Sequence, residues 1–344
     1  MQLPVTRYYG SKRKLVEKIW DVLMARQIGF NSVLDLFGGT GVVSYYMAAR
    51  GKEVIYNDVL QFNCMIARAL LQSHRGVLNE ETMLGLLHEM PDFKYHRYVE
   101  ELYHDIYYLD EENRQIDLVA QNIPLLPPAV QPSAYYVFLQ SCMIKRPFNI
   151  FHRKNLSLRT NFTTAKFGNK KTWEIPFDDL FVRFTRELNR FQFERLPQSR
   201  IENVSALNLH NRADLVYIDT PYFSQKGTNV SYHSRYHFLE GLINYDNIPE
   251  NINRAKNNLE LNLHQCDEFE QKATFMHNLD ALLTMHEDSI IALSYTSDGY
   301  PSIEALADLM AHHKPHVEAV SLGKHPFALN HNNANREEFL ILGY

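Results

Sequence analysis

A strand–helix–strand pattern near the amino end constrains the fold of this chain more than any other feature. Apolar residues over 33–37 predict a strand, the glycine-rich turn 38–41 follows, and residues 42–50 predict a helix that Gly51 ends as a C-cap. Residues 53–56 then predict a second strand. Two strands joined in this way lie parallel with a right-handed crossover, so the chain must form a sheet covered by helices.

Five further runs rich in β-branched and aromatic residues predict strands, at 201–204, 215–218, 289–294, 317–322 and 338–342. The last two have no room for a crossover helix between them and should pair antiparallel. Most of residues 61–144 have a helical pattern, whereas residues 145–176 have the Thr, Asn and aromatic content of hairpins and loops. We therefore predict an α/β sheet domain from residues 1–62 and 195–344, with the helical and basic segment 63–194 inserted into it.

The composition is that of an ordinary globular protein, with 45% hydrophobic and 22% charged residues. No apolar run approaches the roughly 20 residues that span a bilayer. The amino terminus lacks the apolar core of a signal peptide, so we expect a cytoplasmic location and no membrane. Cys64, Cys142 and Cys266 are far apart, which predicts neither a disulfide framework nor a zinc cluster. The histidines of residues 311–316 have no matching Cys or carboxylate cluster and predict a solvated helix end, so we expect no metal.

One segment departs from the acidic net charge of −5. Between Lys145 and Lys171 the sequence has eight basic residues and no acidic one, with aromatic residues interleaved. The basic residues are Lys145, Arg146, Arg153, Lys154, Arg159, Lys166, Lys170 and Lys171. A charge run is usually a solvated face, but so one-sided a run in an acidic protein predicts a surface that faces phosphates.

Residues 35–41, Asp-Leu-Phe-Gly-Gly-Thr-Gly, follow a predicted strand and open a predicted helix. Glycines at such a turn let a ligand approach the backbone closely. The turn has neither the spacing of a dinucleotide-binding loop nor the Lys of a P-loop. Asp58 ends the next strand and is placed to accept hydrogen bonds from ribose hydroxyls. A nucleoside cofactor without phosphates, S-adenosylmethionine above all, fits both features; a tight turn without a ligand is the alternative.

The segment Tyr9-Gly10-Ser11-Lys12 stands just before a predicted helix. The amino end of a helix and the Lys12 ammonium both attract anions, so the segment could meet the carboxylate of a ligand. On its own it could equally be an exposed basic turn.

A second polar segment ends the predicted buried strand 215–218 abruptly, with Asp219-Thr220-Pro221-Tyr222. Taken alone, these residues are typical of a turn after a strand.

Taken together, the motifs resemble the Dam-like, alpha-group adenine-specific DNA methyltransferases. The segments 9–12, 35–41 and 219–222 occur with Asp58 in the order of that family, and residues 139–149 are similar to the passage that opens its target-recognition region. The resemblance covers nearly the whole chain. It implies an α/β fold with a Rossmann-like, seven-stranded S-adenosylmethionine-dependent methyltransferase sheet and an inserted helical and hairpin domain that recognises DNA.

The resemblance also implies the roles of residues 219–222, where the family has Asp-Pro-Pro-Tyr. The exocyclic amine of adenine needs two acceptors to localise its lone pair toward a methyl donor. Asp219 would supply its carboxylate and Thr220 its backbone carbonyl. Pro221 would stiffen the turn, and Tyr222 would stack on the extruded base. Thr220 departs from the usual Pro, but Thr has the required carbonyl as well, and Asp at the first position favours adenine over cytosine.

Further site residues follow from the same resemblance. Those for the cofactor are Tyr9, Gly10, Lys12, Asp35, Phe37, Gly38, Gly39, Gly41, Asp58, Ser205 and Asp219. Those for DNA are Lys145, Arg146, Asn149, Arg153, Lys154, Arg159, Lys166, Lys170, Tyr232 and Arg235. Ser205 departs from the acid that relatives often have there, but it can still hydrogen-bond to the cofactor. Residues 223–238 would close over the flipped nucleotide, and a long surface loop is the alternative.

We therefore predict a DNA adenine N6-methyltransferase that uses S-adenosylmethionine, binds duplex DNA through residues 63–194 and flips the target adenine. A restriction–modification or phage–host epigenetic context fits, with a cognate restriction endonuclease that acts separately as a partner. The alternatives are methylation of the exocyclic amine of cytosine in DNA, methylation of adenine in RNA, and a DNA-binding relative that has lost catalysis.

Overall fold

The computed structural model describes residues 1–344 apart from 6, 9, 162–169, 225–230, 263–267 and 325–335. The chain forms two compact units. The first consists of residues 1–67, 197–231 and 265–344, and the second of residues 68–196 and 232–264. No helix of the described residues combines the length and the apolar character that crossing a membrane requires.

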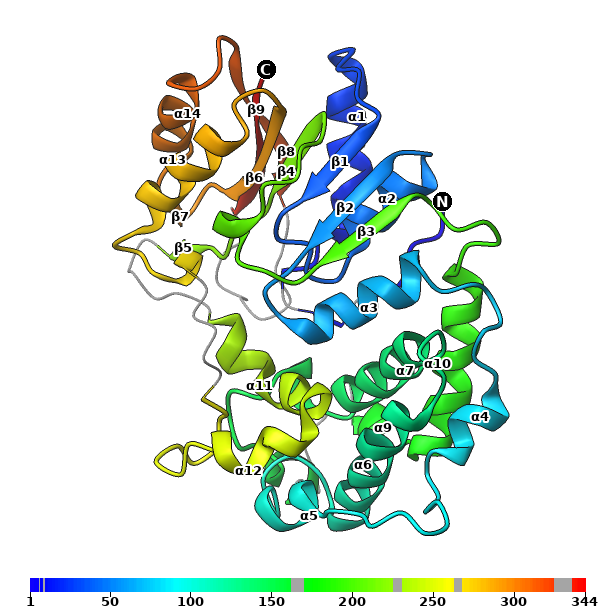
Figure 1. Ribbon diagram of the computed structural model, residues 1–344. Helices are drawn as coiled ribbons and strands as arrows, with labels where there is room; N and C mark the ends of the chain where they lie inside the picture. Colours follow the sequence, from blue (N-terminus) through cyan, green and yellow to red (C-terminus); the bar gives the residue numbers. More distant parts are fainter. Residues whose placement is uncertain (6, 9, 162–169, 225–230, 263–267, 325–335) are drawn as a thin grey trace. The chain divides into compact units, whose positions relative to one another are not determined.

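The first unit is built on one seven-stranded sheet (Figure 1). Its strands in spatial order are β3 (Ser199–Glu202), β2 (Glu53–Asn57), β1 (Ser32–Asp35), β4 (Leu215–Ile218), β6 (Ile290–Thr296), β9 (Glu337–Gly343) and β8 (Val317–Lys324). Neighbours pair parallel from β3 to β6, and β9 pairs antiparallel with both β6 and β8. The seven predicted strands and the antiparallel pairing of the last two are thus confirmed.

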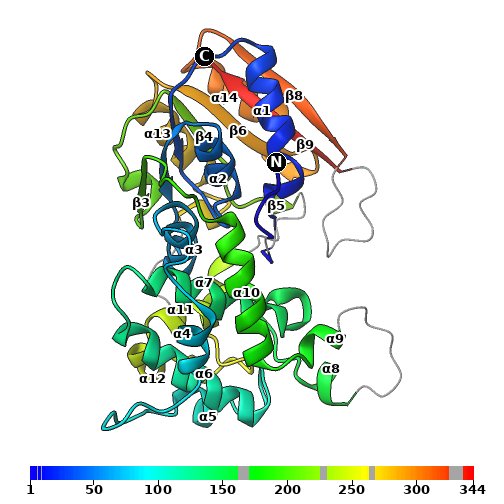
Figure 2. The ribbon, with the colours of Figure 1, turned by 90° about the vertical axis from the view of Figure 1, so that its right-hand side faces the viewer.

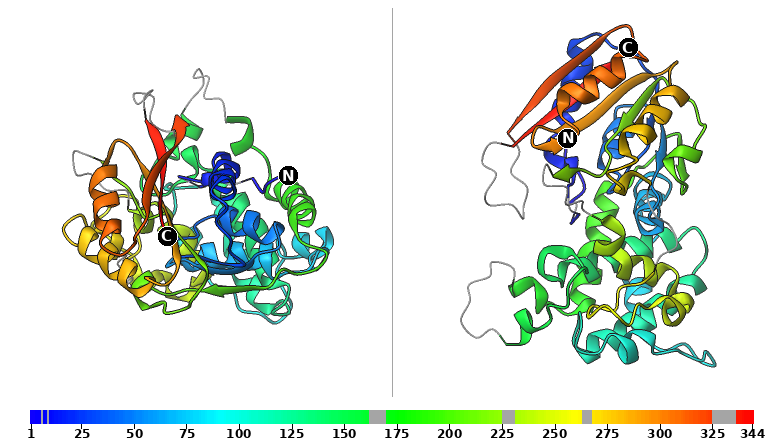
Figure 3. Two further views of the ribbon diagram at one scale, coloured as in Figure 1. Left: turned by 90° about the horizontal axis from the view of Figure 1, so that it is seen from above. Right: turned by 90° about the vertical axis from the view of Figure 1, so that its left-hand side faces the viewer.

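Helices cover both faces of this sheet. One face carries α1 (Val16–Ala25) and α2 (Val42–Ala49), and the other carries α13 (Phe275–Met285) and α14 (Ile303–Ala311) (Figure 2, Figure 3). The core on the α13 and α14 face contains the alternate strand residues Leu34, Leu36, Val216, Ile218, Ile291 and Leu293 with the helix residues Phe275, Leu279, Leu282, Leu306 and Met310. Because helices lie on both sides, the central strand β4 is buried at every residue, as parallel strands usually are.

Short elements complete the first unit at the carboxyl ends of its strands and at its amino end. They are η1 (Lys12–Lys14), η4 (Ala206–Asn208), β5 (Phe223–Ser224), η6 (Glu268–Glu270) and β7 (Gly299–Tyr300). Strands β5 and β7 pair antiparallel as a separate two-stranded sheet.

The second unit is helical in its described part. Its elements are α4 (Glu80–Gly85), α5 (Tyr98–Leu102), α6 (Asp110–Asn122), η2 (Ile123–Leu125), α7 (Gln131–Ile144), η3 (Pro147–Asn149), α8 (Ser157–Thr160), α9 (Lys170–Trp173), α10 (Phe177–Phe191), α11 (Tyr232–Ile243), η5 (Tyr245–Asn247) and α12 (Ile248–Asn251). Helix α3 (Gln61–Leu71) begins in the first unit and ends in the second. Where the structure describes residues 145–176, the predicted loops are present together with η3 and the short helices α8 and α9, and this described part has no hairpin.

The core of the second unit forms between α7 and α10. Helix α7 is buried along nearly its whole length, from Ser133 to Met143. Helix α10 buries one face only, through Phe177, Leu180, Phe181, Phe184, Leu188 and Phe191. This spacing of three and four residues makes α10 an amphipathic helix that covers the nearly fully buried α7.

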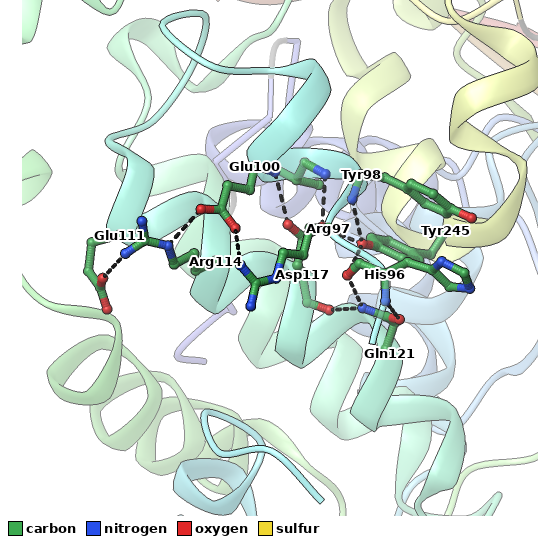
Figure 4. A network of polar contacts seen from close by, with 10 residues as sticks. His96, Arg97, Tyr98, Glu100, Glu111, Arg114, Asp117, Gln121 and Tyr245 are labelled. Carbon is green, nitrogen blue, oxygen red and sulfur yellow. Dashed lines mark hydrogen bonds and ion pairs between the residues drawn. The ribbon is translucent and has the colours of Figure 1, made fainter. Parts of the chain in front are cut away.

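Residues 232–264 belong to the second unit, although the prediction grouped them with the sheet. Figure 4 shows one reason at Tyr245, which follows α11. Its hydroxyl is hydrogen-bonded to the Asp117 carboxylate on α6 and lies 3.1 Å from the His96 carbonyl oxygen. Its ring stacks on Tyr98 with 5.2 Å between the centroids. A polar and aromatic cluster that no local pattern reveals therefore attaches this segment to α5 and α6.

Removing the Tyr245 hydroxyl should weaken the attachment. In Tyr245→Phe, the buried Asp117 carboxylate keeps the backbone N–H donors of Val99 and Glu100 but loses the hydroxyl. A hydrogen bond to a charged group contributes about 1.5–3 kcal/mol, and the free energy of unfolding should fall by about that amount. Urea denaturation followed by circular dichroism measures this. Tyr344→Phe, at a position 41% exposed, is the control; identical midpoints for both variants would contradict the role of Tyr245.

Candidate active site

The turn after β1 requires glycine at three positions. A Cβ atom on Gly38 would lie 2.1 Å from the Tyr56 ring, which leaves no space for a side chain. Gly39 and Gly41 have positive φ angles of 49° and 68°, a conformation that other residues rarely adopt. The predicted glycine-rich turn is thus present, with residues 38–40 partly exposed and Gly41 buried.

Two side chains of the β2 end hold this turn through Gly39. The Gly39 N–H donates to Asp58 Oδ2 at 2.8 Å, and the Tyr56 hydroxyl donates to the Gly39 carbonyl at 2.7 Å. The other Asp58 oxygen accepts the Leu60 N–H at 2.8 Å. Asp58 is therefore held rigidly beside the turn, with a carboxylate that can accept further hydrogen bonds.

Asp35 ends β1 and is 1% exposed. Its Oδ2 accepts the Ser44 hydroxyl at 2.7 Å, whereas Oδ1 is buried and has no hydrogen-bond partner among the described residues. Burial raises the pKa of Asp35 to about 7, and the nearby carboxylates of Asp219 and Asp58 contribute to this rise. A buried, unpaired carboxylate oxygen needs a donor, and a cation would stabilise its ionised form.

The Asp219 carboxylate follows β4 and is bound to a lysine from the amino end of the chain. Lys12 Nζ lies 2.9 Å from Asp219 Oδ1 and 2.6 Å from the Tyr222 hydroxyl oxygen. The Tyr222 hydroxyl donates to the same Asp219 oxygen at 2.8 Å. Lys12 is 4% exposed, so the structure places it inside this cluster. The remaining oxygen, Asp219 Oδ2, has no protein partner among the described residues.

The rest of residues 219–222 supports this arrangement. Thr220 and Pro221 are buried, which holds the turn in place. The Tyr222 ring contacts the Tyr295 ring edge-on at 4.8 Å between centroids. Tyr222 itself stays partly exposed, with Lys12 Nζ 4.7 Å from its ring centroid.

The sequence interpretation missed Glu338, which joins the same cluster. It lies on β9, is 0% exposed, and its Oε2 lies 3.1 Å from the Tyr222 hydroxyl oxygen. The same oxygen lies 3.7 Å from Lys12 Nζ. The sequence does show an acid at the start of an otherwise apolar strand. It shows two, however, and nothing in the sequence indicates that Glu338 is buried while the adjacent Glu337 is partly exposed.

The sequence interpretation also missed Glu268, which lies at Ser205. The Ser205 hydroxyl donates to Glu268 Oε2 at 2.6 Å. A carboxylate from a distant segment therefore lies beside position 205. Next to it, Phe37 packs edge-on against Phe269, with 5.0 Å between the ring centroids.

The amino-terminal motif is described only in part. Gly10 is partly buried with a φ of 81°, whereas Tyr9 lies outside the described residues. In the part of the chain that the structure describes, no group of three or more His, Cys, Asp or Glu side chains could hold a metal ion.

Three predicted DNA contacts have a different environment from the one expected. Lys145 is 1% exposed and lies 2.8 Å from Glu112 Oε1. Arg159 donates to the same carboxylate at 2.7 Å. Although burial opposes ionisation of Glu112, Arg159 and Lys145 keep the pKa of Glu112 below its ordinary value. Glu112 thus pairs with both cations inside the second unit and balances one of their two charges. This arrangement does not agree with a surface that faces phosphates.

Arg146 is also buried, with 1% exposure. Its guanidinium donates to the carbonyls of Tyr107 and Arg153, both at 3.1 Å. It also donates to the Asn155 side chain at 2.5 Å and lies over the Tyr107 ring, 4.5 Å from the centroid. Arg146 therefore organises the backbone after α7 and does not agree with the predicted contact to DNA.

The remaining predicted DNA residues are accessible or outside the described part. Arg153, Lys154 and Lys171 are exposed, and Asn149, Tyr232 and Arg235 are partly exposed. Lys166 lies outside the described residues, as does the side chain of Lys170. The exposed positive charge of the segment is thus smaller than its sequence indicates.

A cavity of about 630 Å³ in the second unit has more acidic than basic lining residues, in contrast to the basic segment 145–171. Its acidic lining residues are Glu89, Glu100, Glu111, Asp117 and Asp178, against Arg97 and Arg114. Figure 4 shows that Arg114 is already paired, with Glu100 at 2.7 Å and Glu111 at 3.2 Å. This acidic lining does not suit phosphates, so the cavity is no candidate for a contact with the DNA backbone.

Comparison with known proteins identifies one family of DNA methyltransferases. The family model for the D12 class N6 adenine-specific DNA methyltransferases matches residues 8–280. A similar protein is the type II methyltransferase M2.HphI of Haemophilus parahaemolyticus, 26% identical over 69% of this chain and 70% of that protein. Another is the type II methyltransferase M.NlaIII of Neisseria lactamica, 21% identical over 88% of this chain and 86% of that protein. The modification methylase LlaI of Lactococcus lactis subsp. lactis is 25% identical over 88% of this chain, which matches 48% of that protein.

Proposed function

The chain belongs to the D12 class of N6 adenine-specific DNA methyltransferases, and we propose that it transfers a methyl group from S-adenosylmethionine to N6 of an adenine flipped out of duplex DNA. The observation that carries this proposal is the register of β1 and β4. These strands are parallel neighbours, with Asp35 opposite Tyr217, so the glycine turn and residues 219–222 emerge at one edge of the sheet. The strand order reverses at this point, where open α/β sheets bind their ligands.

The residues at this edge fit the cofactor. The unpaired Asp35 Oδ1 suits the ammonium group of its methionine part. Asp58 suits the ribose hydroxyls, and it holds the glycine turn beside them through the Gly39 N–H. When bound, S-adenosylmethionine supplies a methyl group on a positively charged sulfur that retains the bonding electrons when the methyl leaves.

The residues of the chain prepare the target amine. The open Asp219 Oδ2 and the Thr220 carbonyl would accept hydrogen bonds from the two N6 hydrogens and localise the nitrogen lone pair. The partly exposed Tyr222 ring would stack on the extruded base. The lone pair forms the new N–C bond, and one N6 proton must leave; the Asp219 carboxylate is the proposed acceptor for it.

DNA recognition is proposed for the second unit, whose exposed basic residues are the candidates for phosphate contacts. Arg153 and Lys154 follow the segment organised by Arg146, and Lys171 lies on α9. Similar proteins are named modification methylases or type II methyltransferases. A restriction–modification context, with a separate endonuclease, is the corresponding proposal for this protein.

The first test concerns the acceptor. Asp219→Ala removes the carboxylate proposed to bind the N6 amine, and groups that act on protons in the transition state contribute about 10²–10⁴-fold. The rate of tritium transfer from labelled cofactor to duplex DNA should fall by at least that lower factor, while calorimetry shows cofactor binding. Asp288→Ala is the control, since that side chain is 71% exposed. Near-normal transfer by Asp219→Ala would defeat the assignment.

The second test uses the pKa of Asp35, which burial raises to about 7. Below this pH the carboxyl is neutral, and above it the carboxylate can pair with the cofactor ammonium. Affinity for S-adenosylhomocysteine should therefore rise from pH 6 to pH 7.5, by at most about tenfold per pH unit for one proton. Asp35→Asn should remove this dependence. Methylthioadenosine, which lacks the ammonium, is the matched ligand control; a rise of the same size with it would assign the titration to another group.

The third test concerns phosphate contacts. Each contact contributes about −0.9 to the slope of log affinity against log salt, so the double variant Arg153→Gln/Lys154→Gln should flatten the slope by nearly two units. Fluorescence anisotropy with labelled duplex DNA measures the slope. Arg212→Gln is the control, because Arg212 is 84% exposed and precedes β4 at the opposite edge of the sheet from Asp219. An unchanged slope in the double variant would make these residues a solvated surface.

A further inference from the structure

Glu338 is a buried carboxylate, and one of its two oxygens has no hydrogen-bond partner among the described residues. It is 0% exposed, and the oxygen without a partner is Oε1. On β9 it stands opposite Thr296 of β6, so it reaches the site from a strand that carries none of the predicted motifs. A buried charge without full pairing is unfavourable, which makes its position beside Asp219 informative.

Lys12 is shared between two carboxylates. Its ammonium is 2.9 Å from Asp219 Oδ1 and 3.7 Å from Glu338 Oε2. The Tyr222 hydroxyl connects the same two carboxylates, at 2.8 Å from Asp219 and 3.1 Å from Glu338. Lys12, Asp219 and Glu338 thus form one cluster with a net charge of −1 when all three are ionised.

A further cation, Arg336, also acts on this cluster. Its guanidinium is 3.0 Å from Asp298 and lies over the Tyr222 ring, 5.8 Å from the centroid, and its charge lowers the pKa of both Lys12 and Glu338. Although burial opposes its charge, Lys12 has a raised pKa because of Asp219 and Glu338. Burial raises the pKa of Glu338, and Lys12 opposes that rise, so the two charges depend on each other.

We propose that Glu338 is a positioning residue for methyl transfer, which holds part of the Lys12 charge and thereby keeps Asp219 strong enough as an acceptor to bind the target amine. This inference rests on the proposed function. With Glu338 ionised, Lys12 cannot neutralise Asp219 completely, and the open Asp219 Oδ2 keeps negative charge for the N6 hydrogens. The Tyr222 hydroxyl fixes the orientation of the carboxylate by occupying Oδ1.

The test is a charge-balance series measured as kcat at saturating cofactor and DNA. Glu338→Gln keeps the size of the side chain but brings the cluster to zero charge, so kcat should fall by about ten- to hundredfold while KM changes little, a typical coupling between charged neighbours. Glu338→Asp retains the charge and should recover part of the loss. The double variant Lys12→Met/Glu338→Gln restores the charge of −1 and should be faster than Glu338→Gln alone.

Glu337→Gln is the matched control, because Glu337 is the preceding residue of β9, lies partly exposed and contacts Ser321 instead of the cluster. Its kcat should stay within about twofold of the unaltered protein, because surface substitutions change stability little. Circular dichroism and the urea midpoint identify a variant that fails to fold. If Glu338→Gln fails to fold, the kcat of Glu338→Asp is compared with that of the unaltered protein instead. Unaltered kcat in Glu338→Gln, or equal losses in the single and double variants, would overturn the inference. An inactive unaltered protein would instead count against the proposed function.

Discussion

The parallel pairing of β1 with β4 is the constraint on which the candidate site depends. Asp35 stands opposite Tyr217 in this ladder, and the Leu36 N–H just beyond it donates to the Tyr217 carbonyl at 3.1 Å. Because the carboxyl ends of parallel strands meet at one edge, the glycine turn and Asp219 emerge together although they are remote in sequence. Backbone hydrogen bonds between β1 and β4 thus fix the distance between the turns that follow these strands. That distance separates the proposed cofactor site from the proposed site of the target base.

Buried charge is the second property of this edge. Lys12 comes from the amino-terminal segment, Asp219 from the middle of the chain and Glu338 from the last strand, and all three lie within one cluster. Charged groups are rarely buried unless they are paired. Here the acids outnumber the lysine, which leaves negative charge beside the place where a positively charged methyl donor would bind. Asp35 adds a carboxyl whose pKa of about 7 allows it to respond to that ligand.

The second unit shows how charge in a sequence can mislead. Lys145 and Arg159 belong to the basic run that predicted a phosphate-facing surface, but both pair with Glu112, which precedes that run in sequence. Arg146 is used to hold backbone carbonyls. The exposed basic residues Arg153 and Lys154 are a smaller set, and they are the ones on which the proposal for DNA binding depends.

Local sequence patterns predicted the seven strands of the main sheet, the antiparallel final pair, the glycine turn and the acid after β4. Each of these follows from residues within a few positions of one another, where backbone geometry and burial pattern leave a local trace. Only contacts in space show that residues 232–264 join the helical unit, that Glu268 accepts the Ser205 hydroxyl, and that Glu338 shares Lys12 with Asp219. They also show which arginines are structural. The physical reason is that the charge, exposure and hydrogen bonding of a side chain depend on neighbours in space, and those neighbours come from segments whose spacing along the chain carries no periodic signal.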